Sequence, residues 1–283
     1  MTTGALVWLL PQTRAGGTTY IAVALLIVAV AELARPAAAH AAHSVRLAAI
    51  GLALAVFWVT IWTGANSPTR SWFGATVSHG SRSSGDVALT FDDGPNATTT
   101  LALASILEDH GARGTFFSVG KAVDARPDIT SDLVARGHLV GNHSYLHDSI
   151  RWLDPRYPEL ARAERTIATR VDVCPAFFRP PHGQHTPFMA RTVRRAEMTM
   201  VTWDVSAGDW STHDAAKIAQ AVLGRVRPGS IIDLHDGLDG RVDVDRTVLL
   251  RAMPLILDGL AARGLHPVRL DVLLGRPGYL AHC

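Results

Sequence analysis

The chain has 283 residues, with 27 Lys or Arg and 25 Asp or Glu, so its formal net charge at pH 7 is +2. This near balance, without a long basic run, argues against nucleic acid as a partner. The length suffices for one large domain with an accessory segment. Two cysteines, Cys174 and Cys283, are too few for a disulfide scaffold. We expect a small core residue and an exposed thiol, with one bond between them as the alternative outside the cytoplasm.

The N-terminal quarter contains two apolar stretches. The first spans about residues 17–34 and has Glu32 near its end, whereas the second, residues 47–65, carries no charged side chain. A membrane-spanning helix needs about 20 mostly apolar residues. Residues 1–65 are therefore predicted to be a membrane anchor with one or two transmembrane helices. The alternatives are a buried globular hairpin and, for the first stretch, a cleaved signal peptide, although its basic flank is weak.

The basic residues between the two stretches indicate an orientation. Arg35 and Arg46 lie between them, and in a two-helix hairpin they would occupy a cytoplasmic loop. Residues 66–85 are rich in Ser, Gly and Thr, and are predicted to form a flexible linker. The main domain, residues 86–283, is thus expected at the cell membrane on its extracytoplasmic side.

From residue 86 onward, short apolar strands alternate with helices. Strands are predicted over 87–91, 114–120, 138–144, 176–181, 198–205, 230–236 and 266–270. Helices are predicted over 99–110, 127–137, 155–171, 187–197, 213–226 and 244–263. The alternation indicates an α/β fold with a mostly parallel sheet. A barrel is favoured over an open sheet because chemically active residue types follow at least five strands. No glycine-rich phosphate loop follows a strand, which argues against a nucleotide ligand.

Two histidines and two aspartates have the spacing of a metal site. His143 and His147 are four residues apart, on one face if the segment is helical, and Asp92 and Asp93 are adjacent at a strand end. Two neutral imidazoles and one carboxylate form a common catalytic zinc site. A cation would also relieve the repulsion between the carboxylates, of which one ligates and the other faces water. The alternative is a solvated turn at "FDDGP" and two histidines without a ligand role.

Two further strand ends carry residues suited to catalysis. Arg179, in "FFRPPHG", is placed to hold a carboxylate through two hydrogen bonds. The rigid Pro-Pro segment after it is placed to aim the backbone N–H of His182 at a developing oxyanion. His235, in "IIDLHDG", is a candidate general acid. The alternatives are a surface arginine beside a stiff turn and a loop histidine with an ordinary hydrogen bond.

Five segments in chain order resemble the five motifs of the polysaccharide deacetylases, which are carbohydrate esterase family 4 and carry the NodB-homology domain. They are "TFDDGP", "HSYLH", "RPPHG", "DVSAGDW" and "LHD". The resemblance covers about residues 85–270. It implies a distorted (β/α) barrel, a divalent metal cofactor, and metal-dependent removal of acetyl groups from sugars. The implied metal is zinc, with cobalt as an alternative.

The resemblance also implies a role for each residue at a matching position. Asp92 matches the catalytic base, Arg179 the residue that holds this base, and His235 the catalytic acid. The family's metal ligands are matched by Asp93, His143 and His147. Its substrate-binding residues are matched by Pro181, His182 and Trp210.

Three positions depart from the usual family motifs. His182 replaces a tyrosine, which changes the pocket wall but keeps the backbone N–H. Ser206 replaces an aspartate that normally orients the arginine, and Asp204 and Asp209 are the candidates to substitute for it. Asp233 interrupts an apolar strand where leucine is usual. The sequence offers no account of this aspartate.

The expected function is metal-dependent hydrolysis of N-acetyl groups on the amino sugars of a cell-envelope polysaccharide, with release of acetate. Peptidoglycan and chitin-like glycans are the expected substrates, because a membrane anchor favours polymers of the envelope. In this reaction Asp92 would take a proton from water, and His235 would protonate the departing amine. The alternatives are an O-acetyl esterase acting on xylan-like polysaccharide, and an inactive membrane-tethered glycan-binding module, for which Ser206 is the argument.

Overall fold

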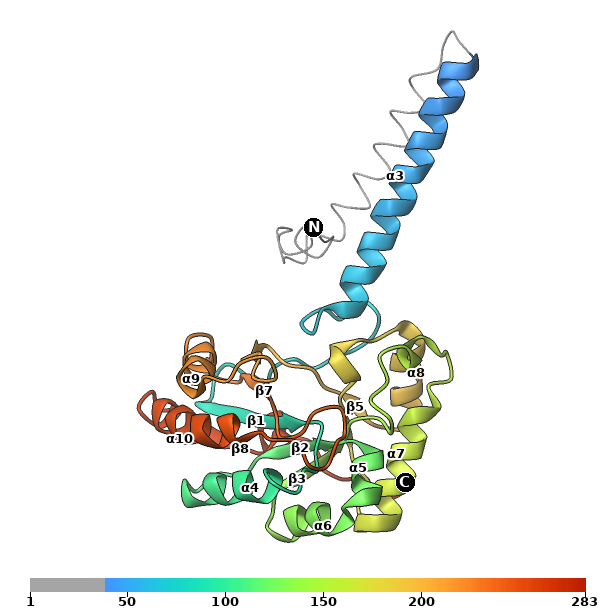
Figure 1. The fold of residues 1–283 in the computed structure, drawn as a ribbon. Coiled ribbons are helices and arrows are strands. Elements are labelled where there is room, and N and C mark those ends of the chain that lie inside the picture. Colours follow the sequence, from blue (N-terminus) through green and yellow to red (C-terminus); the bar gives the residue numbers. More distant parts are fainter. Residues whose placement is uncertain (1–38) are drawn as a thin grey trace. The chain divides into compact units, whose positions relative to one another are not determined.

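The computed structural model describes residues 39–283, and the chain divides into two compact units between Ser67 and Pro68 (Figure 1). The first predicted apolar stretch, residues 17–34, lies outside the described residues. The second lies in helix α3 (Ala39–Asn66). From Arg46 to its end this helix is long and apolar enough to cross a membrane, judged by length and composition only.

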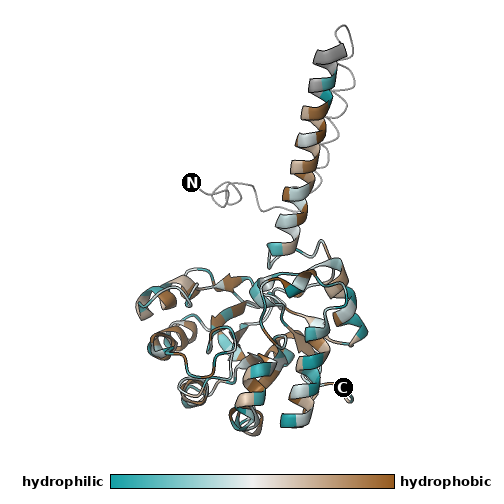
Figure 2. Ribbon diagram, turned by 45° about the vertical axis from the view of Figure 1, so that its right-hand side comes forward, coloured by the Kyte–Doolittle hydropathy of each residue, from teal (hydrophilic) through white to brown (hydrophobic). Residues whose placement is uncertain are grey.

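Apolar residues are distributed around α3 and along its length rather than on one stripe (Figure 2). Large side chains such as Leu54, Phe57 and Trp58 are exposed. A helix that is apolar on all sides needs apolar surroundings, which a bilayer would supply. One such helix is weak support for an anchor, since core helices and signal sequences have the same composition.

Eight parallel strands form one curled sheet in the second unit. They are β1 (Asp86–Asp92), β2 (Thr115–Ser118), β3 (Leu139–Asn142), β4 (Phe177–Phe178), β5 (Thr199–Met200), β6 (Val205–Ser206), β7 (Ile231–His235) and β8 (His266–Val268). The order is β5-β4-β3-β2-β1-β7-β6, with β8 also paired to β1. The predicted distorted (β/α) barrel is confirmed, and because the strands are parallel their carboxyl ends point toward one rim.

The sheet is flanked by helices, of which the longer ones were all predicted. They are α4 (Thr100–Asp109), α6 (Pro127–Ala135), α7 (Pro158–Val171), α8 (Pro187–Arg195), α9 (Ala215–Leu223) and α10 (Thr247–Ala261). The short segments α5 (Gly120–Ala125), α11 (Leu270–Leu274), η1 (Arg151–Leu153) and η2 (Pro181–Gly183) were not predicted. Segments of three to six residues are too short for helical periodicity to be visible in a sequence.

The alternation of side chains along β1 explains where the polar residues lie. Val87, Leu89 and Phe91 pack in one core cluster with residues of α4, α9 and α10. Successive side chains of a strand point to opposite faces, so Thr90 and Asp92 point into the curled sheet. The last residue of β1, Asp92, therefore places its carboxylate inside the sheet at the rim.

The segment predicted to be a flexible linker, residues 66–85, is instead packed against the sheet. Val77 forms a parallel bridge with Val201, just after β5, and His79 forms an antiparallel bridge with Ser230, just before β7. In the described part of the chain β5 and β6 do not pair with each other. The sheet is therefore open between its edge strands β5 and β6. Residues 76–80, which we call the strap, pair with the chain on both sides of this opening. The composition of residues 66–85 predicted a flexible chain because composition alone does not show that an unpaired strand edge lies nearby for the segment to bind.

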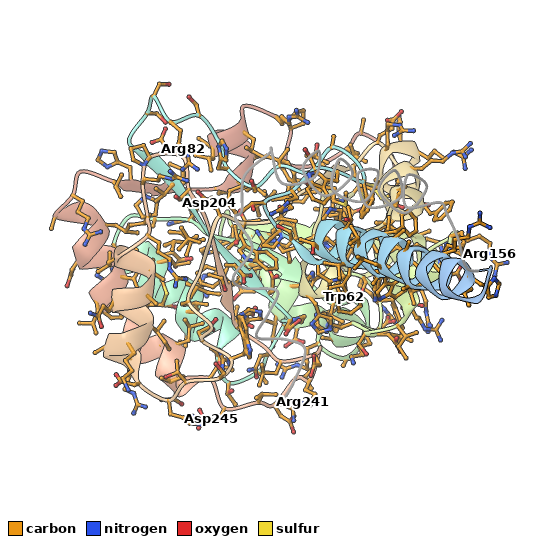
Figure 3. All side chains as sticks on the ribbon, turned by 90° about the horizontal axis from the view of Figure 1, so that it is seen from above. Trp62, Arg82, Arg156, Asp204, Arg241 and Asp245 are labelled. Carbon is orange, nitrogen blue, oxygen red and sulfur yellow. A yellow bond between two sulfur atoms is a disulfide. The ribbon has the colours of Figure 1, made fainter. Side chains whose placement is uncertain are left out.

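An ion pair fixes the chain after the strap. Arg82 Nη2 lies 2.6 Å from Asp204 Oδ2, and the two side chains lie together in Figure 3. Asp204 Oδ1 also accepts from the backbone N–H of Ile231 at 2.9 Å. Asp204 was a candidate to orient Arg179 in place of the aspartate missing at position 206. That prediction is wrong, because the carboxylate of Asp204 is used to hold the segment that follows the strap.

Cys174 and Cys283 form a disulfide across 109 residues of sequence, with Cα atoms 5.2 Å apart. The expectation of two separate thiols is wrong, and the alternative of one bond holds. Backbone pairing brings the two segments together: Leu280 N donates to the Cys174 carbonyl at 2.8 Å, and Pro175 forms a bridge with Tyr279. Such long-range pairing is not visible in cysteine spacing. Disulfides persist in oxidising compartments.

Candidate active site

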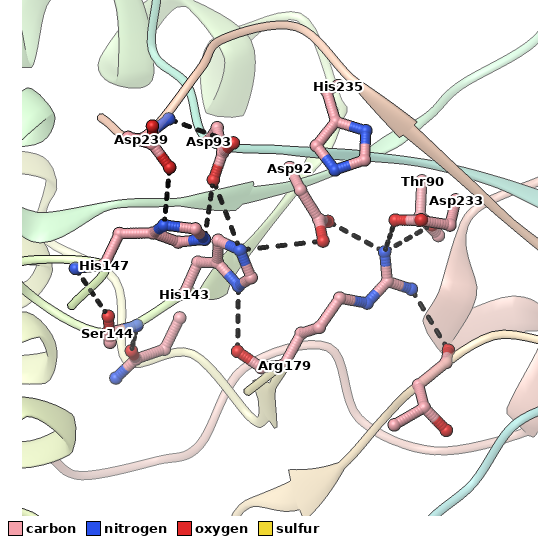
Figure 4. A network of polar contacts seen from close by, with 12 residues as sticks. Thr90, Asp92, Asp93, His143, Ser144, His147, Arg179, Asp233, His235 and Asp239 are labelled. Carbon is pink, nitrogen blue, oxygen red and sulfur yellow. Dashed lines mark hydrogen bonds and ion pairs between the residues drawn. The ribbon is translucent and has the colours of Figure 1, made fainter. Parts of the chain in front are cut away.

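Residues from several strand ends line one cavity of about 340 Å³ at the rim of the sheet. The lining residues are Asp92, Asp93, His143, His147, His182, Trp203, Trp210, His235, Leu238 and Asp239. The parallel sheet explains this gathering, since β1 ends at Asp92, β3 ends one residue before His143, and β7 ends at His235. Figure 4 shows most of these polar side chains in one continuous network.

Asp93, His143 and His147 direct one ligand atom each toward a common point (Figure 4). Asp93 Oδ1 lies 3.0 Å from His147 Nε2 and 3.5 Å from His143 Nε2. This oxygen is buried and has no hydrogen-bond partner among the described residues. Ligand atoms about 2.1 Å from a tetrahedral ion lie about 3.4 Å apart. The spacing and the unpartnered oxygen therefore fit a divalent cation.

The two histidines are presented by a loop and not by a helix. Ser144 and His147 have positive φ angles of 64° and 57°, so the chain turns back on itself between the rings. His147 N donates to Ser144 Oγ at 3.1 Å, and Ser144 N donates to Asn142 Oδ1 at 3.0 Å. A hydrogen-bonded turn therefore brings the rings of His143 and His147 together. The sequence analysis had considered one face of a helix instead.

The second ring nitrogen of each histidine lies close to an oxygen atom, with hydrogen-bond geometry for His143 but not for His147. His143 Nδ1 lies 2.8 Å from the Arg179 carbonyl oxygen, and His147 Nδ1 lies 3.1 Å from Asp239 Oδ1. The backbone N–H of Asp239 donates to Asp93 Oδ2 at 3.0 Å. Such outer partners orient metal-binding imidazoles and leave the Nε2 lone pair for the ion. Asp239 was missed by the sequence analysis, and its only signal was its position in the loop after "LHDG".

Replacing Asp239 by alanine is expected to weaken zinc binding by about 10–100-fold, the usual effect of losing an outer partner of a ligating histidine. The reason is that the substitution frees the His147 ring. Competition with a chelator of known affinity measures this change. Asp243→Ala is the matched control, because Asp243 is an exposed aspartate of the same loop. Equal zinc affinity of the two variants would contradict the role of Asp239.

Burial and neighbouring charges set the protonation of the cluster. Burial lowers the pKa of His147 to about 4, so its imidazole is neutral at neutral pH. Burial raises the pKa of Asp93, but the adjacent imidazole of His143 and the charges of His147 and His235 outweigh burial and hold this pKa well below its usual range. An ionised carboxylate beside a neutral imidazole is the donor set that a divalent cation requires.

Asp92 is not one of the three clustered ligands, and its carboxylate lies between Arg179 and His143 (Figure 4). Its Oδ1 accepts from Arg179 Nη1 at 2.8 Å, and its Oδ2 lies 3.6 Å from His143 Nε2. Arg179 is fully buried, and its other donors reach Thr90 Oγ1 at 2.8 Å and the Thr202 carbonyl at 3.2 Å. The guanidinium thus holds Asp92 through one nitrogen, and the expected two-point contact is wrong.

His235 is held by Asp209 from behind. His235 Nδ1 lies 3.0 Å from Asp209 Oδ1, and His235 N donates to Asp209 Oδ2 at 3.0 Å. Burial lowers the pKa of His235, but the carboxylates of Asp209 and Asp233 outweigh burial and raise it well above its ordinary value. Asp209 was predicted as a possible partner of Arg179. That prediction is wrong, because the two oxygens of Asp209 contact His235 and Arg246.

Aromatic side chains form the walls of the cavity. Trp210 is half exposed, with its ring 4.9 Å from that of His235, and the His182 ring lies 4.6 Å from that of His147. Pro181, expected at the substrate, is buried at the start of η2 and is not one of the lining residues. Trp203 lines the cavity and was missed, because the sequence analysis placed it inside the predicted strand 198–205, whereas β5 ends at Met200.

Comparison with known proteins agrees with this geometry. The sequence model of the polysaccharide deacetylase family matches residues 79–201. A chitooligosaccharide deacetylase from Bradyrhizobium sp. (strain ANU 289) is 33% identical over 193 residues, which are 64% of this chain and 88% of the relative. A crystallised peptidoglycan N-acetylglucosamine deacetylase superposes with a TM-score of 0.66 at 27% identity, covering 72% of this chain and 95% of the other.

A family 4 carbohydrate esterase from Streptomyces lividans, crystallised with acetate, gives a TM-score of 0.58 at 32% identity, with coverage of 65% of this chain and 91% of the other. The fold, the five strand-end segments and these similarities together define a carbohydrate-active hydrolase. The chain belongs to the polysaccharide deacetylase family. Members of this family are metalloenzymes, and Asp93, His143 and His147 offer a site for the metal.

Proposed function

We propose that the protein removes N-acetyl groups from the amino sugars of a cell-envelope polysaccharide, either peptidoglycan or a chitin-like glycan, and releases acetate. The observation that carries this proposal is the buried Asp93 Oδ1, which faces two imidazole nitrogens and has no hydrogen-bond partner within residues 39–283. Asp92 and His235 line the same cavity. The relatives named for chitooligosaccharide and peptidoglycan support amino sugars as the substrate class.

Asp93, His143 and His147 would hold the metal, and the donor set favours zinc, with cobalt as the alternative. A bound ion would supply a Lewis acid that polarises the acetyl carbonyl. Asp92 acts as the general base: Arg179 occupies its Oδ1, so Oδ2 is free to accept a proton from the attacking water.

His235 acts as the general acid. Asp209 holds its Nδ1, which leaves Nε2 to donate a proton to the departing amine as the amide C–N bond breaks. The backbone N–H of His182 contributes to binding the developing oxyanion. The new C–O bond gives acetate, and the sugar leaves with a free amine. Trp210, beside His235, forms a wall for the acetyl group.

Acetate release from the purified full-length protein tests this function. The substrates are N-acetylchitooligosaccharide, peptidoglycan and O-acetylated xylan, with zinc content measured on the same sample. We expect acetate and free amine in equal amounts from an N-acetylated substrate. Acetate from xylan alone would favour the O-acetyl esterase. Binding of a glycan by zinc-loaded protein without any acetate would favour an inactive binding module.

Replacing Asp209 by asparagine is expected to move the alkaline limb of the pH–rate profile down by about 1–3 pH units, the usual effect of one nearby opposite charge. The general acid works only while protonated, and Asp209 raises the pKa of His235. Without that charge, His235 loses its proton at lower pH. Profiles of kcat/KM measure the shift. Asp204→Asn is the control, since Asp204 pairs with Arg82. An unmoved alkaline limb in Asp209→Asn would refute this role.

We further propose that residues 1–65 anchor the enzyme in the cell membrane and that the catalytic domain, the compact unit Pro68–Cys283, faces the extracytoplasmic side. The apolar segment of α3 supports an anchor by its length and composition. The bond between Cys174 and Cys283 supports an oxidising compartment. Protease treatment of right-side-out membrane vesicles tests the orientation, because only an extracytoplasmic domain is then accessible to digestion.

A further inference from the structure

Asp233 is a buried carboxylate on the strand that carries the general acid, and the function proposed above gives it no role. It is 1% exposed. The sheet register places Asp233 beside Thr90 of β1 on one side and beside Ser206 of β6 on the other. The same register pairs Asp92 with His235 two residues further along. Thr90, Asp233 and Ser206 therefore form a polar row inside the sheet, directly beneath the base and the acid.

The row surrounds one nitrogen of Arg179. Nη1 lies 3.5 Å from Asp233 Oδ1 and 2.8 Å from both Asp92 Oδ1 and Thr90 Oγ1 (Figure 4). Ser206 Oγ lies 3.1 Å from the second oxygen of Asp233. In the part of the chain that the structure describes, Asp233 Oδ1 makes no hydrogen bond. The guanidinium lies 3.5 Å from this oxygen, and a ring nitrogen of His235 lies within 4.8 Å of the Asp233 carboxylate.

A buried carboxylate is unfavourable unless a positive charge or several donors compensate it. Burial raises the pKa of Asp233 to about 7, which reflects this cost, while the charges of His235 and Arg179 act in the opposite direction. Asp92, Asp233 and His235 also have the spacing of a metal site. The guanidinium already places a positive charge between Asp92 and Asp233, so these carboxylates share one fixed cation.

We propose that Asp233 is the positioning residue of Arg179, and that it supplies from β7 the carboxylate that Ser206 does not supply from β6. This inference rests on the proposed function, in which Arg179 holds the base Asp92. It explains two departures as one exchange: serine in place of the usual aspartate at 206, and aspartate in place of the usual leucine at 233. The small hydroxyl of Ser206 leaves room for the carboxylate of its neighbour and donates to it.

The test uses the isosteric variant Asp233→Asn and the double variant Ser206→Asp/Asp233→Leu, which moves the carboxylate back to β6. Asp233→Asn is expected to lower kcat by about 10–100-fold, the usual effect of losing a supporting partner. KM and bound zinc should be unchanged, because substrate and metal touch other residues. The double variant should recover kcat to within a few-fold of the wild type. Ser206→Ala, which removes only the hydroxyl, is the matched control and should have a smaller effect.

Crystal structures of the wild type and both variants give a readout that does not depend on turnover. The guanidinium should leave Asp92 in Asp233→Asn and return to it in the double variant. An undisplaced Arg179 with wild-type kcat in Asp233→Asn would overturn the inference. If Asp233→Asn does not fold, the double variant decides: Arg179 on Asp92 supports the inference, whereas a displaced Arg179 or an unfolded double variant overturns it. A wild-type enzyme that releases no acetate would refute the proposed function alone.

Discussion

Replacing Asp92 by asparagine is expected to lower kcat by about 10²–10⁴-fold, the usual contribution of a general base, while zinc remains bound. The side chain keeps its shape, and its oxygen can still accept from Arg179, which donates to Asp92 Oδ1 at 2.8 Å. What is lost is the oxygen that receives the proton from water. Steady-state rates of acetate release, together with zinc per chain, measure both parts of this expectation.

The outcome for zinc separates the roles of the two adjacent aspartates. Asp92 contributes no atom to the cluster of Asp93, His143 and His147, so the metal should survive the substitution. Loss of zinc along with activity would show that Asp92 is a ligand and would contradict the assignment of the base. Wild-type kcat in Asp92→Asn would contradict it equally.

Replacing Asp93 by alanine is expected to remove both metal and activity. Asp93 is the only carboxylate in the cluster with His143 and His147, and its Oδ1 lies 3.0 Å and 3.5 Å from their Nε2 atoms. The loss in zinc affinity should exceed the ~10–100-fold expected for an outer partner. Zinc content after dialysis and acetate release at limiting zinc give the two measurements.

Two comparisons make the Asp93 experiment specific. Chelation of the wild type should reproduce the inactive state, and added zinc should restore the wild type but not Asp93→Ala at the same concentration. His138→Ala is a control for loss of a buried histidine, because His138 lies at Glu108, outside the cavity. Retention of one zinc per chain in Asp93→Ala would mean that the ion binds elsewhere.

Much of the fold was predictable because its signals are local. Residues 87–91 alternate between the helix-facing core and the interior of the sheet, and this periodicity survives in the sequence. Parallel strands end at one rim, so Asp92, His143 and His235 were expected to lie near each other despite their separation in the chain. The resemblance of the five ordered motifs to the polysaccharide deacetylases then predicted which parallel fold it is, a distorted (β/α) barrel.

The partners of individual carboxylates were not predictable, because they depend on register between strands. Nothing local distinguishes Asp204, which holds Arg82, from Asp209, which holds His235. Asp233 had no explanation until β7 was seen beside Ser206 and near Arg179. The disulfide was missed for the same reason, since it depends on how two distant segments meet.

The strap has a consequence for where the enzyme begins. Judged by composition, the catalytic part would start at Asp86, the first residue of β1, but the compact unit starts at Pro68. A fragment cut at Asp86 would lack Val77 and His79, and the edges beside Val201 and Ser230 would be left open to solvent and to other chains. A soluble version for crystallisation should therefore start at Pro68 and keep residues 68–85, although their composition resembles that of a linker.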